Sequence, residues 1–114
     1  MKKVFVLSVT LLLAACASPG TLRERGPLVK LKSNKTQSVV VACIKEAFED
    51  HMNPAYIFTT PRTNGATSVS FGTKQYNVSH VMVDVSTTAA GSESLFYAQV
   101  SDPSPWIKWA SDCQ

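Results

Sequence analysis

The clearest pattern along the chain is a change of hydrophobic periodicity near Pro54. Over residues 38–52, apolar side chains recur at spacings of three and four, which predicts an amphipathic helix. Asn53 and Pro54 then end this helix. Residues 81–86 and 94–100 alternate in period two, as half-buried strands do. Two shorter strands, over residues 55–60 and 67–71, flank the hairpin signal Asn64-Gly65.

A short closing helix is expected near the end of the chain. Trp106, Trp109, Ala110 and Cys113 fall there at helical spacing. The predicted order is a helix, four strands in an antiparallel meander and a short helix. Helices on one face of an antiparallel sheet give an α+β domain of two layers. Trp106 and Trp109 are interpreted as residues at the edge of the core rather than as exposed binding anchors.

The first fifteen residues have the pattern of a secretory signal peptide. Lys2 and Lys3 precede an apolar run over residues 4–13, and two alanines follow. The run has about 10 residues, whereas a helix needs about 20 to cross a bilayer. A permanent transmembrane anchor is therefore not expected here.

The end of this leader carries a more specific motif. Residues Leu13-Ala14-Ala15-Cys16 resemble the lipobox of bacterial lipoproteins. The resemblance implies cleavage before Cys16 and a lipid anchor on that cysteine. Because Ala17 and not Asp follows, it also implies the outer membrane, with the protein facing the periplasm. The alternative is an ordinary signal peptide, with Cys16 inside the mature chain.

Residues 16–36 are predicted to form a flexible tether, and residues 37–114 a single periplasmic domain. The tether segment contains two glycines and two prolines and no sustained periodicity. Its charges are mainly basic, and such a segment is attracted to anionic headgroups or is simply a solvated linker. From residue 38 onward, seven acidic residues outnumber four basic ones. An exported chain with a mildly acidic domain is not expected to bind nucleic acid.

With Cys16 assigned to lipid, two cysteines remain, Cys43 and Cys113. Because exported proteins keep disulfides, we expect one structural bridge between them, with both sulfurs buried. Two free thiols or links between chains are the alternatives. A bridge between Cys43 and Cys113 would close a loop of about 70 residues and would stabilise the fold by about 4 kcal/mol. Neither cysteine belongs to a Cys-x-x-Cys pair, which argues against a redox function.

The domain also resembles a group of short, poorly characterised lipoproteins of Gram-negative bacteria. The resemblance rests on Cys43-Ile44, on Phe48-Glu49, on the small β meander and on the late Cys113. It implies no activity and carries over no catalytic residue.

The sequence offers no constellation typical of a catalytic or metal site. His51 and His80 lack the paired spacing of zinc ligands, and no Gly-x-Ser-x-Gly motif is present. We therefore expect no cofactor, no metal and no enzymatic activity. The first hypothesis is a non-catalytic protein-binding module, such as an inhibitor or immunity protein against a cell-wall-degrading enzyme. The alternative is a structural or assembly accessory of the cell envelope or of a secretion system.

The binding surface is expected on the sheet face that the helices leave open. Phe96 and Tyr97 are adjacent in a predicted strand, so only one of them can face the helices. The other is predicted to be exposed, or covered by a protein partner. Phe96 and Tyr97 are accordingly the candidate partner-binding residues.

Overall fold

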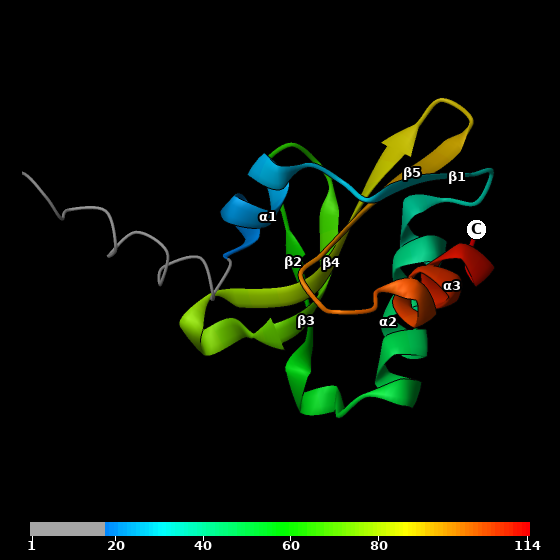
Figure 1. Ribbon diagram of the computed structural model, residues 1–114. Coiled ribbons are helices and arrows are strands. Elements are labelled where there is room, and N and C mark those ends of the chain that lie inside the picture. Colours follow the sequence, from blue (N-terminus) through cyan, green and yellow to red (C-terminus); the bar gives the residue numbers. More distant parts are fainter. Residues whose placement is uncertain (1–17) are drawn as a thin grey trace, which may run out of the picture.

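The computed structural model describes residues 18–114, so the predicted signal peptide and Cys16 lie outside the described residues. The elements are α1 (Pro19–Arg25), β1 (Val29–Ser33), α2 (Gln37–His51), η2 (Pro54–Tyr56), β2 (Ile57–Pro61), β3 (Thr67–Thr73), η3 (Lys74–Tyr76), β4 (Val78–Thr88), β5 (Gly91–Ala98) and α3 (Ser104–Asp112). Here η2 and η3 are single 3-10 turns. Figure 1 shows α2 and α3 on one side of the sheet and α1 on the other. The α+β class is as predicted, but α1 adds a third layer over part of the sheet.

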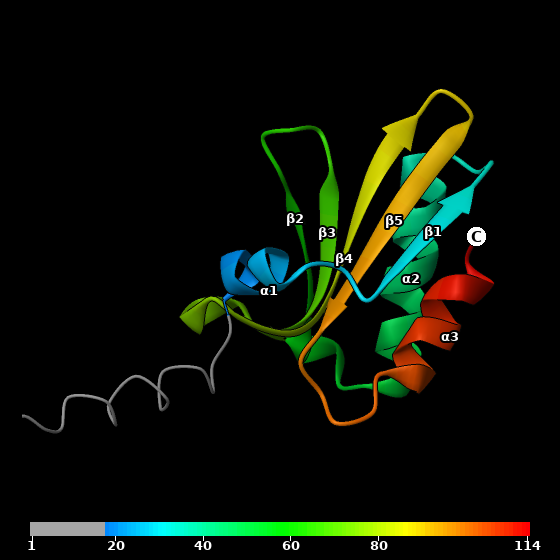
Figure 2. The ribbon, with the colours of Figure 1, turned by 45° about the horizontal axis from the view of Figure 1, so that its top comes forward.

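The sheet has five antiparallel strands in the order β1-β5-β4-β3-β2. The four predicted strands form the expected meander from β2 to β5. The count of four is wrong, because β1 joins the free edge of β5 with Val29 opposite Phe96. Figure 2 shows β1 lying along β5. Val29 and Leu31 alternate with two lysines, which is the period of a half-buried edge strand.

The first part of the predicted tether is folded in the same way. Ser18 caps α1 by accepting a hydrogen bond from the backbone N–H of Thr21. Gly26, at φ 88°, ends the helix in a conformation that favours glycine. Leu22 is 1% exposed against the sheet. The expectation of a flexible tether is therefore wrong for residues 18–33, whose prolines and glycines mark the ends of elements.

The helix layer covers the other face of the sheet. Helix α2 runs within one residue of the predicted bounds, and Val40, Ile44 and Phe48 are its fully buried residues. Across from them lie the apolar positions of the strands, including Val83 and Phe96. The rings of Phe48 and Trp106 meet edge to face, with their centroids 5.0 Å apart. Trp106 is thus a core residue, as interpreted from the sequence.

The predicted disulfide is present and joins α2 to the end of α3. Cys43 and Cys113 are bonded, with their Cα atoms 5.7 Å apart. Cys113 is buried, whereas Cys43 is only partly buried, so the expectation for the two sulfurs is met at Cys113 alone. The bond fixes the position of α3 on α2, and with it the shape of the helix layer.

The described chain contains no helix that combines the length and the apolar composition needed to span a bilayer.

Candidate binding groove on the α1 face

The two aromatic residues predicted to bind a partner are both covered by the protein itself. Phe96 is fully buried beneath the helix layer. Tyr97 points to the opposite face, as alternation requires, but it is only 6% exposed because Leu22 and Met82 pack against it. The prediction of an exposed aromatic anchor at Phe96 or Tyr97 is therefore wrong. The physical reason is α1, which covers this part of the sheet.

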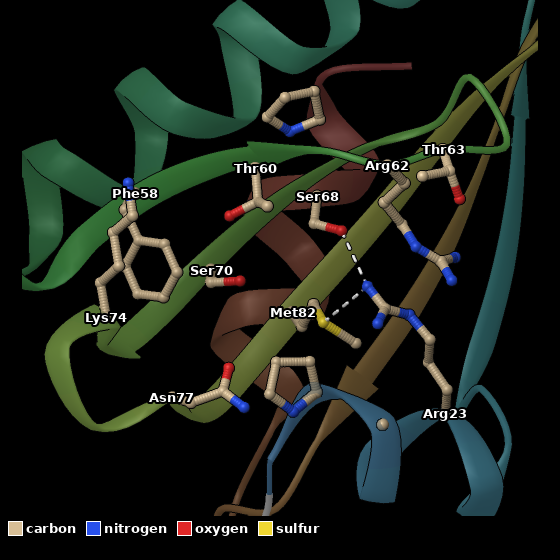
Figure 3. A pocket seen from close by; sticks show the side chains of 13 residues that line it. Arg23, Phe58, Thr60, Arg62, Thr63, Ser68, Ser70, Lys74, Asn77 and Met82 are labelled. Atoms are coloured by element: carbon tan, nitrogen blue, oxygen red, sulfur yellow. Dashed lines mark hydrogen bonds between the residues drawn. The ribbon is translucent and has the colours of Figure 1, made fainter.

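The remainder of the same face is hollowed into a groove of about 590 Å³ between α1 and the β2–β3 hairpin. We call the sheet surface that α1 partly covers the α1 face, and this hollow the groove. Figure 3 shows side chains from α1, β2, β3 and β4 converging on it. Its lining residues are Pro19, Gly20, Arg23, Phe58, Thr60, Pro61, Arg62, Thr63, Ser68, Ser70, Lys74, Asn77 and Met82.

A buried carboxylate organises one end of the groove. Asp84 of β4 is 3% exposed and lies opposite Ser68 of β3. Arg23 donates to it twice, from Nε at 2.8 Å and from Nη2 at 3.0 Å. Arg62 donates from Nη1 at 3.4 Å, and the Ser68 hydroxyl donates to the other carboxylate oxygen. Each oxygen of Asp84 thus accepts two donors, which fills the usual acceptor capacity of a carboxylate.

This cluster also sets the electrostatics of its neighbours. The hydrogen bond to Asp84 raises the pKa of Arg23 above the ordinary arginine value, and the charge of Asp84 adds to the effect. Burial, followed by the charge of Asp84, raises the pKa of Tyr97 above 10.0. Both groups keep their protons at neutral pH. Arg23 therefore stays cationic and Tyr97 neutral.

Chemically, the groove offers donors rather than acceptors. Arg23, Arg62 and Lys74 are three cations, and the Asp84 carboxylate is paired with Arg23 and Arg62. Ser70 is 2% exposed, and Figure 3 shows it among the lining side chains with no hydrogen bond to the others drawn. A hollow with surplus positive charge and hydroxyl donors fits a ligand with anionic oxygen atoms.

Charge is divided between the two sides of the molecule. On the α1 face, Lys30 and Lys32 of β1 stand opposite Leu95 and Glu93, and Leu95 packs on the Leu22 cluster. That side, with α1 and η3, carries six basic residues (Arg23, Arg25, Lys30, Lys32, Arg62 and Lys74) and three acidic residues (Glu24, Asp84 and Glu93). Helices α2 and α3 carry two basic and four acidic residues: Lys45, Lys108, and Glu46, Glu49, Asp50, Asp112.

The two histidines play other parts. His51 stacks on Trp109 with ring centroids 4.0 Å apart and is hydrogen-bonded to the carbonyl of Ala47. His80 lies beside Phe71, at 5.8 Å between centroids. Within residues 18–114, no group of three or more His, Cys, Asp and Glu side chains is arranged to hold a metal ion.

Sequence reasoning missed the groove because it missed α1. The signals were present, since Ser18-Pro19 is a typical helix start and Gly26 a typical stop. Once α1 is placed, Arg23 follows Leu22 on a helix packed against the sheet. An unpaired Asp84 in a buried strand position would then have indicated the need for a cation.

Comparisons of the chain with known protein families, with curated proteins and with solved structures found no match.

Proposed function

We propose that the chain is a lipid-anchored protein of the bacterial cell envelope and that its domain is a non-catalytic protein-binding module. The leader and the lipobox-like residues before Cys16 support the anchor. The bond between Cys43 and Cys113 supports an exported location, because disulfides persist in oxidising compartments. The anchor would place the protein on the periplasmic side of the outer membrane.

The main observation in support of a protein-binding module is the acidic surface of α2 and α3. Its charges lie on a rigid layer, because the disulfide and the buried Phe48–Trp106 contact hold the two helices together. This layer is on the opposite side of the sheet from α1, which begins three residues after Cys16 in the sequence (Figure 1). An acidic, rigid surface directed away from the membrane favours association with a basic protein. The proposed partner is a basic cell-wall-degrading enzyme, which the domain would inhibit.

The anchor is tested by the substitution Cys16→Ser. The variant should leave the membrane fraction, or accumulate with its leader uncut, while the original protein remains in the membrane pellet. Fractionation with immunoblotting measures both outcomes. Normal processing together with continued membrane retention of the variant would overturn the lipid anchor.

The binding surface is tested by reversing charge on α2. Glu46 and Asp50 are exposed, and the double variant Glu46→Lys, Asp50→Lys should weaken inhibition of basic cell-wall hydrolases by at least about tenfold. The matched control is Glu24→Lys, Glu93→Lys, which makes the same charge change on the α1 side. Clearing of a cell-wall suspension is the readout. Equal losses in both double variants, or no inhibition by the original protein across a panel of such enzymes, would contradict the proposal.

A further inference from the structure

The start of α1 places the domain close to the proposed anchor. This step rests on the lipidation proposed above. Ser18, which caps α1, is two residues from Cys16, and two peptide units span at most about 8 Å. Because α1 is packed on the sheet through Leu22, a lipid on Cys16 would hold the α1 face near the membrane surface. Pro19 and Gly20, in the first turn of α1, also line the groove.

The surface around the groove has the composition of a membrane-facing side. Lys30, Lys32 and Lys74 are exposed there, and cations near a membrane are attracted to anionic headgroups. Tyr76, in the same turn as Lys74, is 71% exposed. Figures 1 and 2 both draw this turn on the same side of the sheet as α1. Tyrosine is enriched at membrane–water interfaces, so its exposure is accounted for in this orientation.

We infer that the groove binds the phosphate of an anionic phospholipid headgroup in the membrane to which the protein is anchored. Arg23 pairs with Asp84 through two hydrogen bonds, and its positive charge offsets the carboxylate charge that would otherwise repel a phosphate. Arg62 makes one long hydrogen bond to Asp84, from Nη1 to Oδ2 at 3.4 Å. The other N–H groups of its guanidinium can therefore donate to a ligand. Together with Lys74 and the Ser70 hydroxyl, Arg62 supplies charge-assisted donors to anionic oxygens.

The test uses the Cys16→Ser chain from residue 16 onward, which carries neither leader nor lipid, so the outcome does not depend on the anchor. Cosedimentation is measured with vesicles of phosphatidylcholine alone and with vesicles that also contain phosphatidylglycerol. The protein should prefer the phosphatidylglycerol vesicles. The double variant Arg62→Gln, Lys74→Gln should reduce this binding about tenfold more than the control Lys30→Gln, Lys32→Gln. The control removes two charges from the same face outside the groove.

Each of the other outcomes would overturn the inference. Equal losses in the two double variants would show diffuse attraction without a groove site. Equal binding to both kinds of vesicle would exclude recognition of the headgroup. Saturable binding of inorganic phosphate or of an acidic peptide, without a preference for anionic vesicles, would assign the groove to a soluble ligand. Circular dichroism of every variant shows that it is folded, and Ser70→Ala provides a second groove variant that leaves the net charge unchanged.

Discussion

At the scale of single residues, Asp84 ties the two sides of the groove together. Its carboxylate is buried in the sheet, and its partners come from α1, from the end of the β2–β3 hairpin and from β3. A buried carboxylate is tolerated only when it is paired and hydrogen-bonded. Arg23 supplies the two shortest nitrogen contacts, so it compensates most of this cost.

Substituting Arg23→Ala should therefore lower the free energy of unfolding by about 2–3 kcal/mol, because it leaves the buried carboxylate underpaired. Urea denaturation followed by circular dichroism measures the change. Lys45→Ala is a suitable control, because its pair with Glu49 is partly exposed and should contribute about 0.5 kcal/mol or less. Comparable losses in the two variants would show that the Arg23–Asp84 pair has no special role in stability.

The ionisation of the Tyr97 phenol at high pH can be measured and reports on the packing of the α1 face. Its folded pKa lies above the unfolded value of 10.0, so the folded state holds the phenol proton more tightly. Stability linked to this proton is fully present below pH 10 and is lost as the pH rises through the folded pKa. Subtracting the ultraviolet titration of Tyr97→Phe from that of the original protein should isolate a phenol that ionises above pH 10. Ionisation of this phenol at or below pH 10 would contradict the buried environment.

At the scale of elements, α1 is the feature on which the α1 face depends. Leu22 is its one buried residue, and it covers Met82 and Tyr97. Leu22→Ala should destabilise the protein by about 2–3 kcal/mol, because it opens a cavity between helix and sheet. It should also bring the Tyr97 pKa back toward 10.0, since burial is the main cause of the shift. Denaturation and the same ultraviolet titration measure the two effects, and an unchanged titration would show that Leu22 does not shield the phenol.

The elements also show what could be predicted from the sequence. Helix α2 and strands β4 and β5 carry long periodic patterns, and they were found within a few residues of their bounds. Strand β1 has only five residues. Because lysines occupy its alternate positions, the segment was interpreted as part of a basic linker. Helix α1 buries a single leucine, and only a proline at its start and a glycine at its end mark it in the sequence. Such short elements are stabilised by tertiary packing, and the local sequence pattern does not reveal those tertiary contacts.

The candidate site was predictable only in outline. The sequence placed Phe96 and Tyr97 on opposite faces of one strand, and this alternation is confirmed. The cover over Tyr97 depends on Leu22, and the contact of Arg23 with Asp84 joins residues 61 positions apart. No periodicity encodes that contact. The pairing of Cys43 with Cys113 was accessible, because excluding Cys16 left only two cysteines to pair within the chain.

At the scale of the whole molecule, one covalent bond links the two helices of the α2–α3 layer. The Cys43–Cys113 bond closes a loop with a sequence separation of 70 residues. In the chain-entropy model, replacing both cysteines by alanine should lower the free energy of unfolding by about 4 kcal/mol. Chemical denaturation of the double variant measures this loss. Intact mass after alkylation without reductant should show no modified Cys43 or Cys113 in the original protein, and two alkylated thiols would contradict the bond.

The pairing of β1 with β5 has a consequence for the biogenesis of the protein. Residues 29–33 find their sheet partners only at residues 92–96, on the far side of the whole meander. A chain that crosses a membrane from its N-terminus onward cannot complete this sheet until its late residues have emerged, and such long-range pairing is slow. In the exported protein that we propose, closure of the sheet and oxidation of the cysteines would both follow translocation.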